Sequence, residues 1–241
     1  MTLFRIASAL LSYPDAPLRA ALPEILEAIE RADFVSAEER AVLAGLVDRL
    51  SAADPVSAEA DYVSTFDMVP EHSLHLTHHL IGEDRNRGPA LIDLTEFFKA
   101  HGFEVREKEL PDYLPLLLEF VALLGAEEGL PFLARWNRVL RQLRANLADA
   151  KSPYAELIGL IETRSRPAGA DDAADATPAA KRSQPCLDDG DFHPQVSWSA
   201  PAACAPSQVP IGVPIRLHGR AAEFPEFPSP VTQDAETLAH D

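Results

Sequence analysis

Cysteine and basic residues are scarce in this sequence of 241 residues. The two cysteines, Cys186 and Cys204, are separated by 17 residues, a spacing that supports neither a disulfide framework nor a metal knuckle. The 21 Lys and Arg residues are outnumbered by 38 Asp and Glu residues, which gives a net charge of −17. Nucleic-acid binding and electrostatic attachment to an anionic membrane both need clustered basic residues, so the composition argues against these partners.

Long apolar runs are also missing. The most apolar stretch, residues 113–118, is ended by Glu119 and is far shorter than the ~20 residues of a membrane span. The first five residues do not form the basic start of a secretory signal. The hydrophobic content of 46% still supplies a core and rules out a wholly disordered chain. We therefore expect a cytoplasmic protein with no stable membrane association.

Apolar residues recur every three to four positions through residues 1–163, the spacing that places them on one helix face. Sustained period-two alternation with hairpin turns is not found in this sequence. The predicted fold class is all-α, with residues 1–163 forming one multi-helix bundle. The expected helices cover residues 3–11, 18–29, 36–50, 54–66, 89–101, 113–124, 130–147 and 153–161.

Polar residues at the expected helix ends support this interpretation. Ser36 and Glu39 have the spacing of a capping box, in which each side chain accepts a backbone N–H of the first turn. Asp54, which is followed by a proline, is expected to cap the next helix. Gly102 is expected to end a helix, and Asp112 to cap the apolar helix that follows.

Residues 164–241 have a different composition. They make up 78 of the 241 residues but contain 11 of the 21 prolines. Within them, residues 168–180 consist of Ala, Asp, Gly, Thr and Pro, which bury little surface. We expect a proline-rich, largely disordered tail with, at most, short extended or docked pieces. A tail that recruits partners would make the chain a general adaptor, which is one open possibility.

Half of the eight histidines lie within eight residues, from His72 to His79. On a helix, His72, His75 and His79 would share one face and could present imidazoles to a divalent ion, with Glu83 and Asp84 as oxygen ligands. The segment lacks the H-E-x-x-H pattern of metalloproteases. A polar helix face, a pH-sensitive interface, and a metal-binding hydrolase or metal carrier all remain open for this cluster.

Carboxylates gather before the expected apolar helix, at Glu109 and Asp112, with Glu119 further on. Such a group can serve acid–base chemistry, but helix capping explains Asp112 more simply. The nucleophile elbow, the Walker loop and the dinucleotide-binding glycine pattern are all missing from the sequence. We therefore expect a non-enzymatic binding protein, without a cofactor, whose site is a groove between helices.

Six short motifs share a pattern with a known family. Together they resemble the NarJ-type assembly chaperones of respiratory nitrate reductase, within the wider family of redox-enzyme maturation proteins. The resemblance covers roughly residues 3–163. The motifs are LLSYP at 10–14, YVSTFD at 62–67, EHSLHL at 71–76, GEDRNRG at 82–88, ELPDYLP at 109–115 and LLEF at 117–120.

The resemblance implies an all-α fold and a chaperone function. Members bind the N-terminal segment of the molybdoenzyme catalytic subunit and hold that subunit in the cytoplasm. The molybdenum cofactor and an iron–sulfur cluster are inserted during this time, before membrane assembly. The implied partner is thus the catalytic subunit of nitrate reductase, and molybdenum cofactor delivery proteins are further candidates. The chaperone itself catalyses no reaction.

The resemblance also implies which residues face the peptide. The acidic signature of the wider family corresponds to Glu109, Pro111 and Asp112, and Tyr113 stands where many relatives have histidine. This departure suits the nitrate reductase branch and argues against a role for an imidazole at that position. The other half of the peptide-facing region corresponds to Tyr62, Phe66, Asp67, Glu71 and His72.

A basic, amphipathic peptide needs a groove with an acidic rim and an apolar floor. Residues 1–163 carry 27 acidic and 15 basic side chains, so the bundle can supply the rim. The rim is expected to consist of Asp67, Glu71, Glu109 and Asp112. The floor is expected to consist of Tyr62, Leu116 and Phe120.

Overall fold

The computed structural model describes residues 2–166, apart from 34, 83, 84, 86 and 106–108, together with residues 217–219. The expectation of a disordered tail concerns residues that lie, almost entirely, outside this described part. The helices are α1 (Thr2–Leu10), α2 (Ala16–Glu30), α3 (Ala37–Ala52), α4 (Pro55–Tyr62), α5 (Leu76–Ile81), α6 (Arg87–Ala100), α7 (Leu114–Leu124), α8 (Ala126–Ala134), α9 (Asn137–Asp149) and α10 (Ala155–Arg164). The shorter elements are the π-helical turn η1 (Val63–Asp67), the 3-10 turn η2 (Pro70–His72) and the strands β1 (Phe103–Val105) and β2 (Leu217–Gly219).

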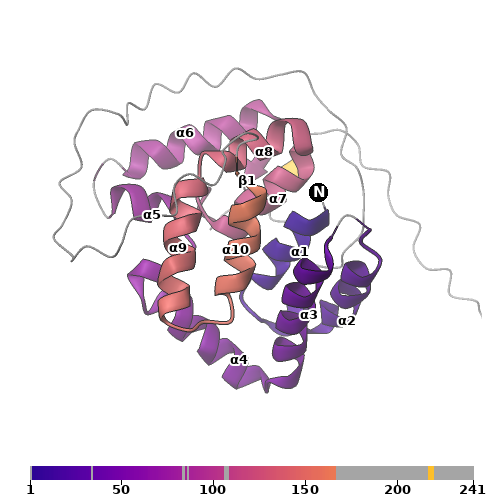
Figure 1. Ribbon diagram of the computed structural model, residues 1–241. Coiled ribbons are helices and arrows are strands. Elements are labelled where there is room, and N and C mark those ends of the chain that lie inside the picture. The colour runs from indigo at the N-terminus through magenta and orange to yellow at the C-terminus, as the bar shows by residue number, and fades with distance from the viewer. Residues whose placement is uncertain are drawn as a thin grey trace, which may run out of the picture.

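The helices form a bundle, which confirms the all-α prediction (Figure 1). The last two helices, α9 and α10, lie side by side, and α2 and α3 form a second packed pair. Helix α7 packs against α1 on one side and α8 on another. None of the described helices combines the length and apolar character needed to cross a bilayer.

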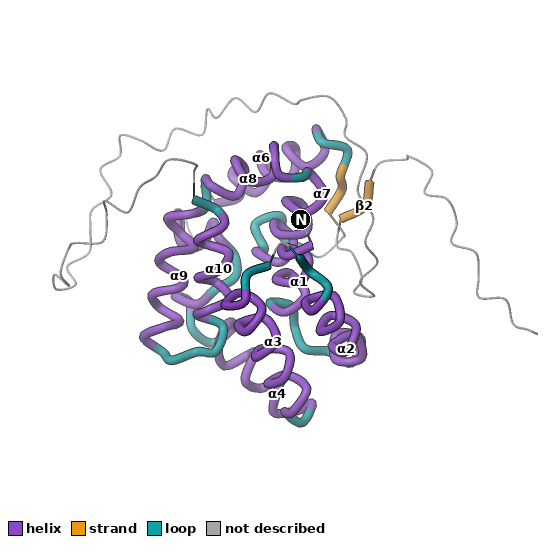
Figure 2. Tube along the Cα trace, turned by 45° about the vertical axis from the view of Figure 1, so that its right-hand side comes forward, coloured by secondary structure: helices purple, strands orange, loops and turns teal. Residues whose placement is uncertain are grey.

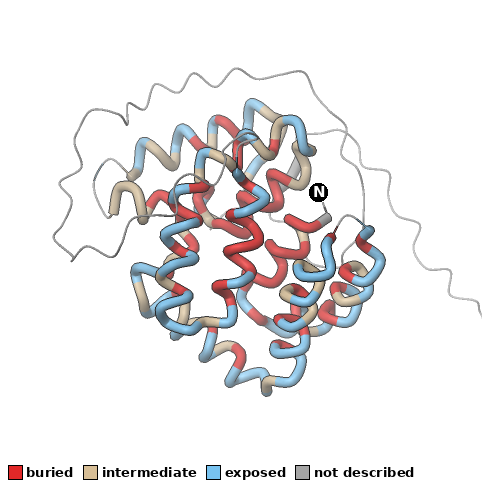
Figure 3. Tube along the Cα trace, viewed as in Figure 1, coloured by how far each residue is buried: buried red, intermediate tan, exposed pale blue. Residues whose placement is uncertain are grey.

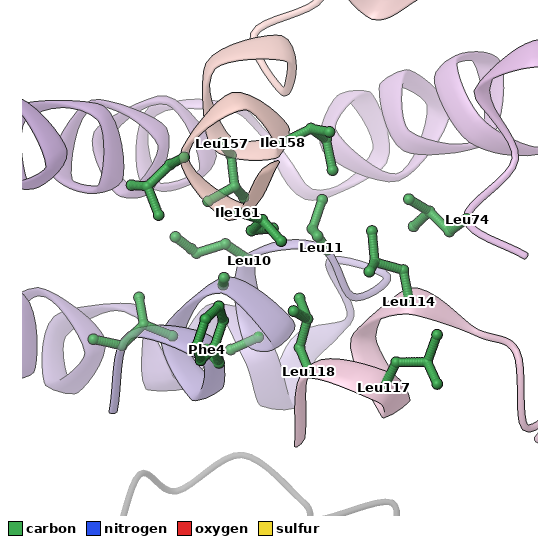
Figure 4. Packing of buried hydrophobic residues seen from close by; sticks show 14 of the residues in the cluster. Phe4, Leu10, Leu11, Leu74, Leu114, Leu117, Leu118, Leu157, Ile158 and Ile161 are labelled. Carbon is green, nitrogen blue, oxygen red and sulfur yellow. The ribbon is translucent and has the colours of Figure 1, made fainter. Parts of the chain in front are cut away.

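Helix α7 is the centre of the core. Every residue from Leu114 to Val121 is buried, and a helix that is apolar on all sides can only be stable when it is covered on all sides. Burial is concentrated in α1, α7 and α10, whereas the outer helices expose one face (Figure 3). Leu118 of α7, Leu10 of α1 and Ile161 of α10 belong to one cluster of buried apolar side chains (Figure 4).

Three of the predicted helix ends are confirmed. Ser36 and Glu39 form the reciprocal capping box, and the Asp54 carboxylate accepts the backbone N–H of Ser57 at 3.1 Å. Gly102 follows α6 with a φ of 82°, a left-handed conformation that favours glycine. The prediction that Asp112 caps α7 is wrong. Tyr113 occupies the N-cap position, and its side chain makes no capping hydrogen bond.

The single helix expected over residues 130–147 is also wrong. The chain breaks between α8 and α9, at Arg135 and Trp136. The reason is a change of packing partner, because α8 packs against α7 whereas α9 packs against α10. Asn137, the first residue of α9, donates from its amide to the Glu162 carbonyl at 2.8 Å, which fixes the new direction. Apolar periodicity shows that a face is buried and does not show against which helix.

The strands were not expected from periodicity. β1 and β2 form an antiparallel pair at the edge of the bundle (Figure 2). The segment of the tail at Leu217–Gly219 is therefore one of the short docked pieces that the composition allowed. Period-two patterns need four or more residues to be recognised, and each of these strands has three.

Gly129 marks the closest approach of α8 to α7. A Cβ atom at Gly129 would lie 2.6 Å from the backbone oxygen of Val121, whereas one at Gly45 in α3 would meet nothing within 4 Å. We predict that Gly129→Ala lowers the free energy of unfolding by about 1–3 kcal/mol, because the two helices must separate. The matched variant Gly45→Ala should instead raise it by up to ~1 kcal/mol through helix propensity. Urea titration followed by circular dichroism measures both, and equal effects would contradict the packing argument.

Candidate functional site

Two of the sequence motifs meet through backbone hydrogen bonds. The N–H of Leu76 donates to the Asp112 carbonyl at 3.0 Å, and the N–H of Leu114 donates to the Leu74 carbonyl at 2.8 Å. These bonds form a single antiparallel bridge between His75 and Tyr113. The EHSLHL motif therefore lies directly beside the ELPDYLP motif, although the two are more than 30 residues apart.

The Asp112 carboxylate is fully buried at this junction and is surrounded by donors. Nδ1 of His75 donates to Oδ1 at 3.0 Å, and the Thr77 hydroxyl and backbone N–H both donate to Oδ2. Arg87 adds an ion pair, with Nη2 3.3 Å from Oδ2, and its Nε donates to the Thr77 hydroxyl at 3.1 Å. We refer to Asp112, His75, Thr77 and Arg87 as the Asp112 cluster.

The cluster keeps Asp112 ionised. Burial alone would raise the pKa of this carboxyl group. Hydrogen bonds from His75 and Thr77, and the positive charge of Arg87, outweigh burial and hold the pKa below its ordinary value. Asp112 therefore joins residues 75–87 to the start of α7, and it is not available as part of an acidic rim.

Tyrosine hydroxyls connect the same junction to α4. The Tyr62 hydroxyl donates to the Leu11 carbonyl at 3.0 Å and lies 3.0 Å from the Tyr113 hydroxyl, which must then be the donor to Tyr62. The ring of Tyr13 packs edge-on against Tyr62, with centroids 5.5 Å apart. Burial raises the pKa of Tyr62, so this hydroxyl stays protonated and functions as a structural link.

The π-helical turn η1 separates inward from outward side chains. Phe66 is buried between Tyr62 and Tyr154, with ring centroids 4.9 Å and 4.8 Å away respectively. The next residues, Asp67 and Met68, are exposed. An exposed acidic side chain and an exposed apolar side chain thus directly follow the buried aromatic Phe66 in the sequence.

The histidines do not share a helix face, so that expectation is wrong. His72 lies in η2 and contacts the Thr65 and Asn146 carbonyls at 3.0 and 3.3 Å, and His75 contacts Asp112. His79 lies in α5, where its Nε2 donates to the Ser73 carbonyl at 2.7 Å.

Each of the three imidazoles is held by a different part of the chain. Burial lowers the pKa of His79, which favours its neutral form. In the described part of the chain, no group of three His, Cys, Asp or Glu side chains could hold a metal ion. Glu83 and Asp84, the further ligands considered from the sequence, lie outside that part.

The expected peptide-facing residues divide into two groups. Asp67 and Glu71 are exposed, and Glu109 and Tyr113 are partly exposed. Most of the expected floor is covered, because Leu116 and Phe120 have no exposed surface and lie within the core around α7. The buried members of the expected set are Tyr62, Phe66, His72, Pro111, Asp112, Leu116 and Phe120.

Apolar side chains that the sequence interpretation missed lie beside the accessible acids. Met68 follows Asp67 and is 72% exposed, and Leu110 follows Glu109 and is 41% exposed. Tyr13 is also exposed, to 40%. Tyr13 and Leu110 lie within the family motifs, and Met68 directly follows one. Exposure decides which apolar residues are accessible, and it cannot be obtained from a motif.

A cavity of about 350 Å³ is lined in part by Ser64 and Thr65 of η1. Its walls include His72, Tyr154 and the oppositely charged Arg49 and Asp61. Burial raises the pKa of Tyr154 to about 12, so its hydroxyl is neutral. The cavity is thus of mixed polarity.

Residues 14–158 match the family described as nitrate reductase delta subunit. The chain belongs to the nitrate reductase delta subunit family. The matched range contains the Asp112 cluster and all the expected peptide-facing residues from Tyr62 to Phe120. The resemblance to NarJ-type proteins that the motifs indicated is confirmed.

Several relatives of this delta subunit family member are named as nitrate reductase molybdenum cofactor assembly chaperones. The nitrate reductase molybdenum cofactor assembly chaperone NarJ of Escherichia coli K12 is 35% identical over 213 residues, 85% of this chain and 88% of that protein. A probable NarJ chaperone of Bacillus subtilis 168 is 34% identical over 158 residues, 66% of this chain and 85% of that protein. A probable NarW chaperone of Escherichia coli K12 is 27% identical over 161 residues, 67% of each chain.

Removing the buried charge should destabilise the fold. We predict that Asp112→Asn lowers the free energy of unfolding by about 3 kcal/mol at pH 7, because Arg87 loses its buried partner. The control Asp67→Asn, at an exposed site, should change it by less than ~0.5 kcal/mol. Urea denaturation of the three proteins measures these differences, and equal stability of both variants would contradict the structural role of Asp112.

The same comparison has a defined pH dependence. The pKa of Asp112 is lower in the folded than in the unfolded chain. The ionised carboxylate therefore makes its full contribution to the free energy of unfolding above the ordinary Asp pKa of about 4. The contribution is lost as the pH falls through the lower, folded-state pKa. The stability difference between wild type and Asp112→Asn should therefore shrink below about pH 4. A difference that grew on acidification would contradict the direction of the pKa shift.

Proposed function

We propose that this protein is a chaperone for the assembly of a respiratory nitrate reductase. It binds the N-terminal segment of the catalytic subunit in the cytoplasm, and it holds that subunit while the molybdenum cofactor and an iron–sulfur cluster are inserted. It catalyses no reaction and releases the subunit for assembly with its membrane anchor. The observation that carries the proposal is the 35% identity to an assembly chaperone across 88% of that protein.

The surface above η1 and before α7 supports a peptide-binding role. The Tyr62–Tyr113 hydrogen bond joins the segment that carries Asp67 to the segment that carries Glu109. Exposed Met68 and Leu110 follow these two acids directly. We refer to Asp67, Met68, Glu109, Leu110 and Tyr113 as the peptide face.

The peptide face combines acidic and apolar side chains, as a basic, amphipathic segment requires. Carboxylates on the surface attract the positive residues of the peptide, and the apolar side chains contact its other side. The net charge of −17 extends this attraction beyond the face itself, so it raises the rate of encounter. The buried Asp112 contributes to the shape of the face and not to its charge pattern.

Charge reversal on the peptide face tests this proposal. We predict that Asp67→Lys and Glu109→Lys each lower the affinity for a synthetic N-terminal peptide of the cognate catalytic subunit by about three- to tenfold. The reason is that a surface ion pair contributes up to ~1 kcal/mol and reversal replaces attraction by repulsion. Calorimetric titration gives the affinities, and the loss should diminish as salt is added.

The matched control is Glu30→Lys, which makes the same charge change at an exposed position at the end of α2. Its effect on affinity should be less than twofold, and the helical circular-dichroism spectrum of all three variants should be unchanged. Equal losses in the three variants would show that only net charge matters. No binding of the peptide to the wild-type protein at micromolar concentration would contradict the proposed function itself.

A further inference from the structure

The protein binds part of its own C-terminal region at β1. In the antiparallel pair, Phe103 lies opposite Gly219, Glu104 opposite His218, and Val105 opposite Leu217. β2 also lies against α7. Figure 2 shows the two strands side by side at the edge of the bundle. The contact joins segments that are more than 100 residues apart in the sequence.

β1 is well placed to receive an extended chain. Phe103 and Val105 pack against the core, and the Phe103 ring lies edge-on to Phe120 with centroids 5.6 Å apart. Glu104, between them, is exposed. The inward side chains fix β1 on the bundle, so its backbone N–H and C=O groups form a rigid edge for pairing.

The β1–β2 pair is weakly held. Each strand has three residues, and the sheet has two strands. A two-stranded pair of this size is marginal in water, because few hydrogen bonds offset the entropy of ordering the chain. Closing the long connection from α10 to β2 adds a further entropic cost. The pair can therefore open without unfolding the bundle.

The pair contacts the elements on either side of one segment of the peptide face. β1 ends at Val105 and α7 begins at Leu114, so the segment between them carries Glu109, Leu110 and Tyr113. β2 contacts both of the elements that flank this segment. A client peptide that extends from this segment along β1 or α7 would need the same surface as β2.

Resting on the proposed function, we infer that the C-terminal segment Leu217–Gly219 is a latch that competes with the client peptide. The latch holds β1 and α7 when no client is bound, and the client displaces it. Docking of the tail and binding of the client are thus mutually exclusive. A latch that is closed in nine of ten molecules lowers the apparent affinity for the client about tenfold.

A disulfide across the strand pair can lock the latch. Opposed residues of an antiparallel pair have Cα atoms ~4.5–5.5 Å apart, within the range of a disulfide. The test protein is the full chain with Glu104→Cys and His218→Cys, and with Cys186→Ser and Cys204→Ser to remove other thiols. Affinity for the client peptide is measured by calorimetry after mild oxidation and again after reduction.

We expect oxidation to weaken peptide binding at least tenfold and reduction to restore it. The matched control carries Glu104→Cys without the change at position 218, and its affinity should be the same in both states. A gel without reductant verifies that the crosslink is intramolecular. Failure of the two cysteines to crosslink would overturn the latch, because opposed residues must meet.

Opening the latch is the complementary test. The backbone N–H groups of neighbouring strand residues point to opposite sides, so one of residues 217 and 218 directs its N–H towards β1. The double variant Leu217→Pro and His218→Pro removes both N–H groups, and therefore the one that faces β1. We expect the bundle of residues 2–166 to stay folded in this variant, and its helical circular-dichroism spectrum verifies this. We expect the variant to bind the peptide up to about tenfold more tightly than the wild type.

The outcomes separate the latch from the proposed function. If the peptide binds equally to the oxidised, reduced and proline-substituted proteins, the latch is wrong and the chaperone function stands. If the wild-type and proline-substituted proteins both fail to bind, the proposed function is wrong and the latch falls with it. Weaker binding by the proline-substituted protein would also overturn competition, because it would make the tail part of the binding site.

Discussion

A carboxylate with no exposed surface must find its counter-charge and donors inside the fold, because burying it alone costs several kcal/mol. Asp112 is such a group, and its partners His75, Thr77 and Arg87 come from the segment that surrounds α5. This requirement fixes how the chain enters α7, the helix around which the bundle packs. It also fixes Tyr113, which belongs to the surface that we propose as the peptide face.

Local sequence predicted most of the helices because its signals act over short distances. The capping box at Ser36 and the left-handed turn at Gly102 each involve residues within one helical turn. Asp112 also precedes an apolar helix, as a capping residue would, but the groups that donate hydrogen bonds to it are 25 to 37 residues away in the sequence. The break between α8 and α9 at Trp136 likewise depends on contacts with other helices. In both cases, contacts between residues far apart in the sequence explain why the structure differs from the prediction.

The candidate site was predicted in part for a similar reason. A family motif contains residues that build the fold and residues that face a partner, and it does not separate them. Leu116 and Phe120 belong to α7, which is covered on all sides, so they cannot form a floor without opening the core. Asp67 and Glu109 remain accessible because they lie in η1 and in the connection before α7. Met68, missed earlier, is exposed for the same reason as Asp67.

The separation of β1 and β2 along the chain has a consequence for the newly made protein. Synthesis proceeds from the N-terminus, and domains fold as they emerge from the ribosome. The bundle, which ends with α10 at Arg164, can fold while residues 217–219 are still inside the exit tunnel. The surface proposed as the peptide face can therefore form before β2 is available to pair with β1. Under the proposed function, a nascent chain could therefore meet its client before the latch is able to close.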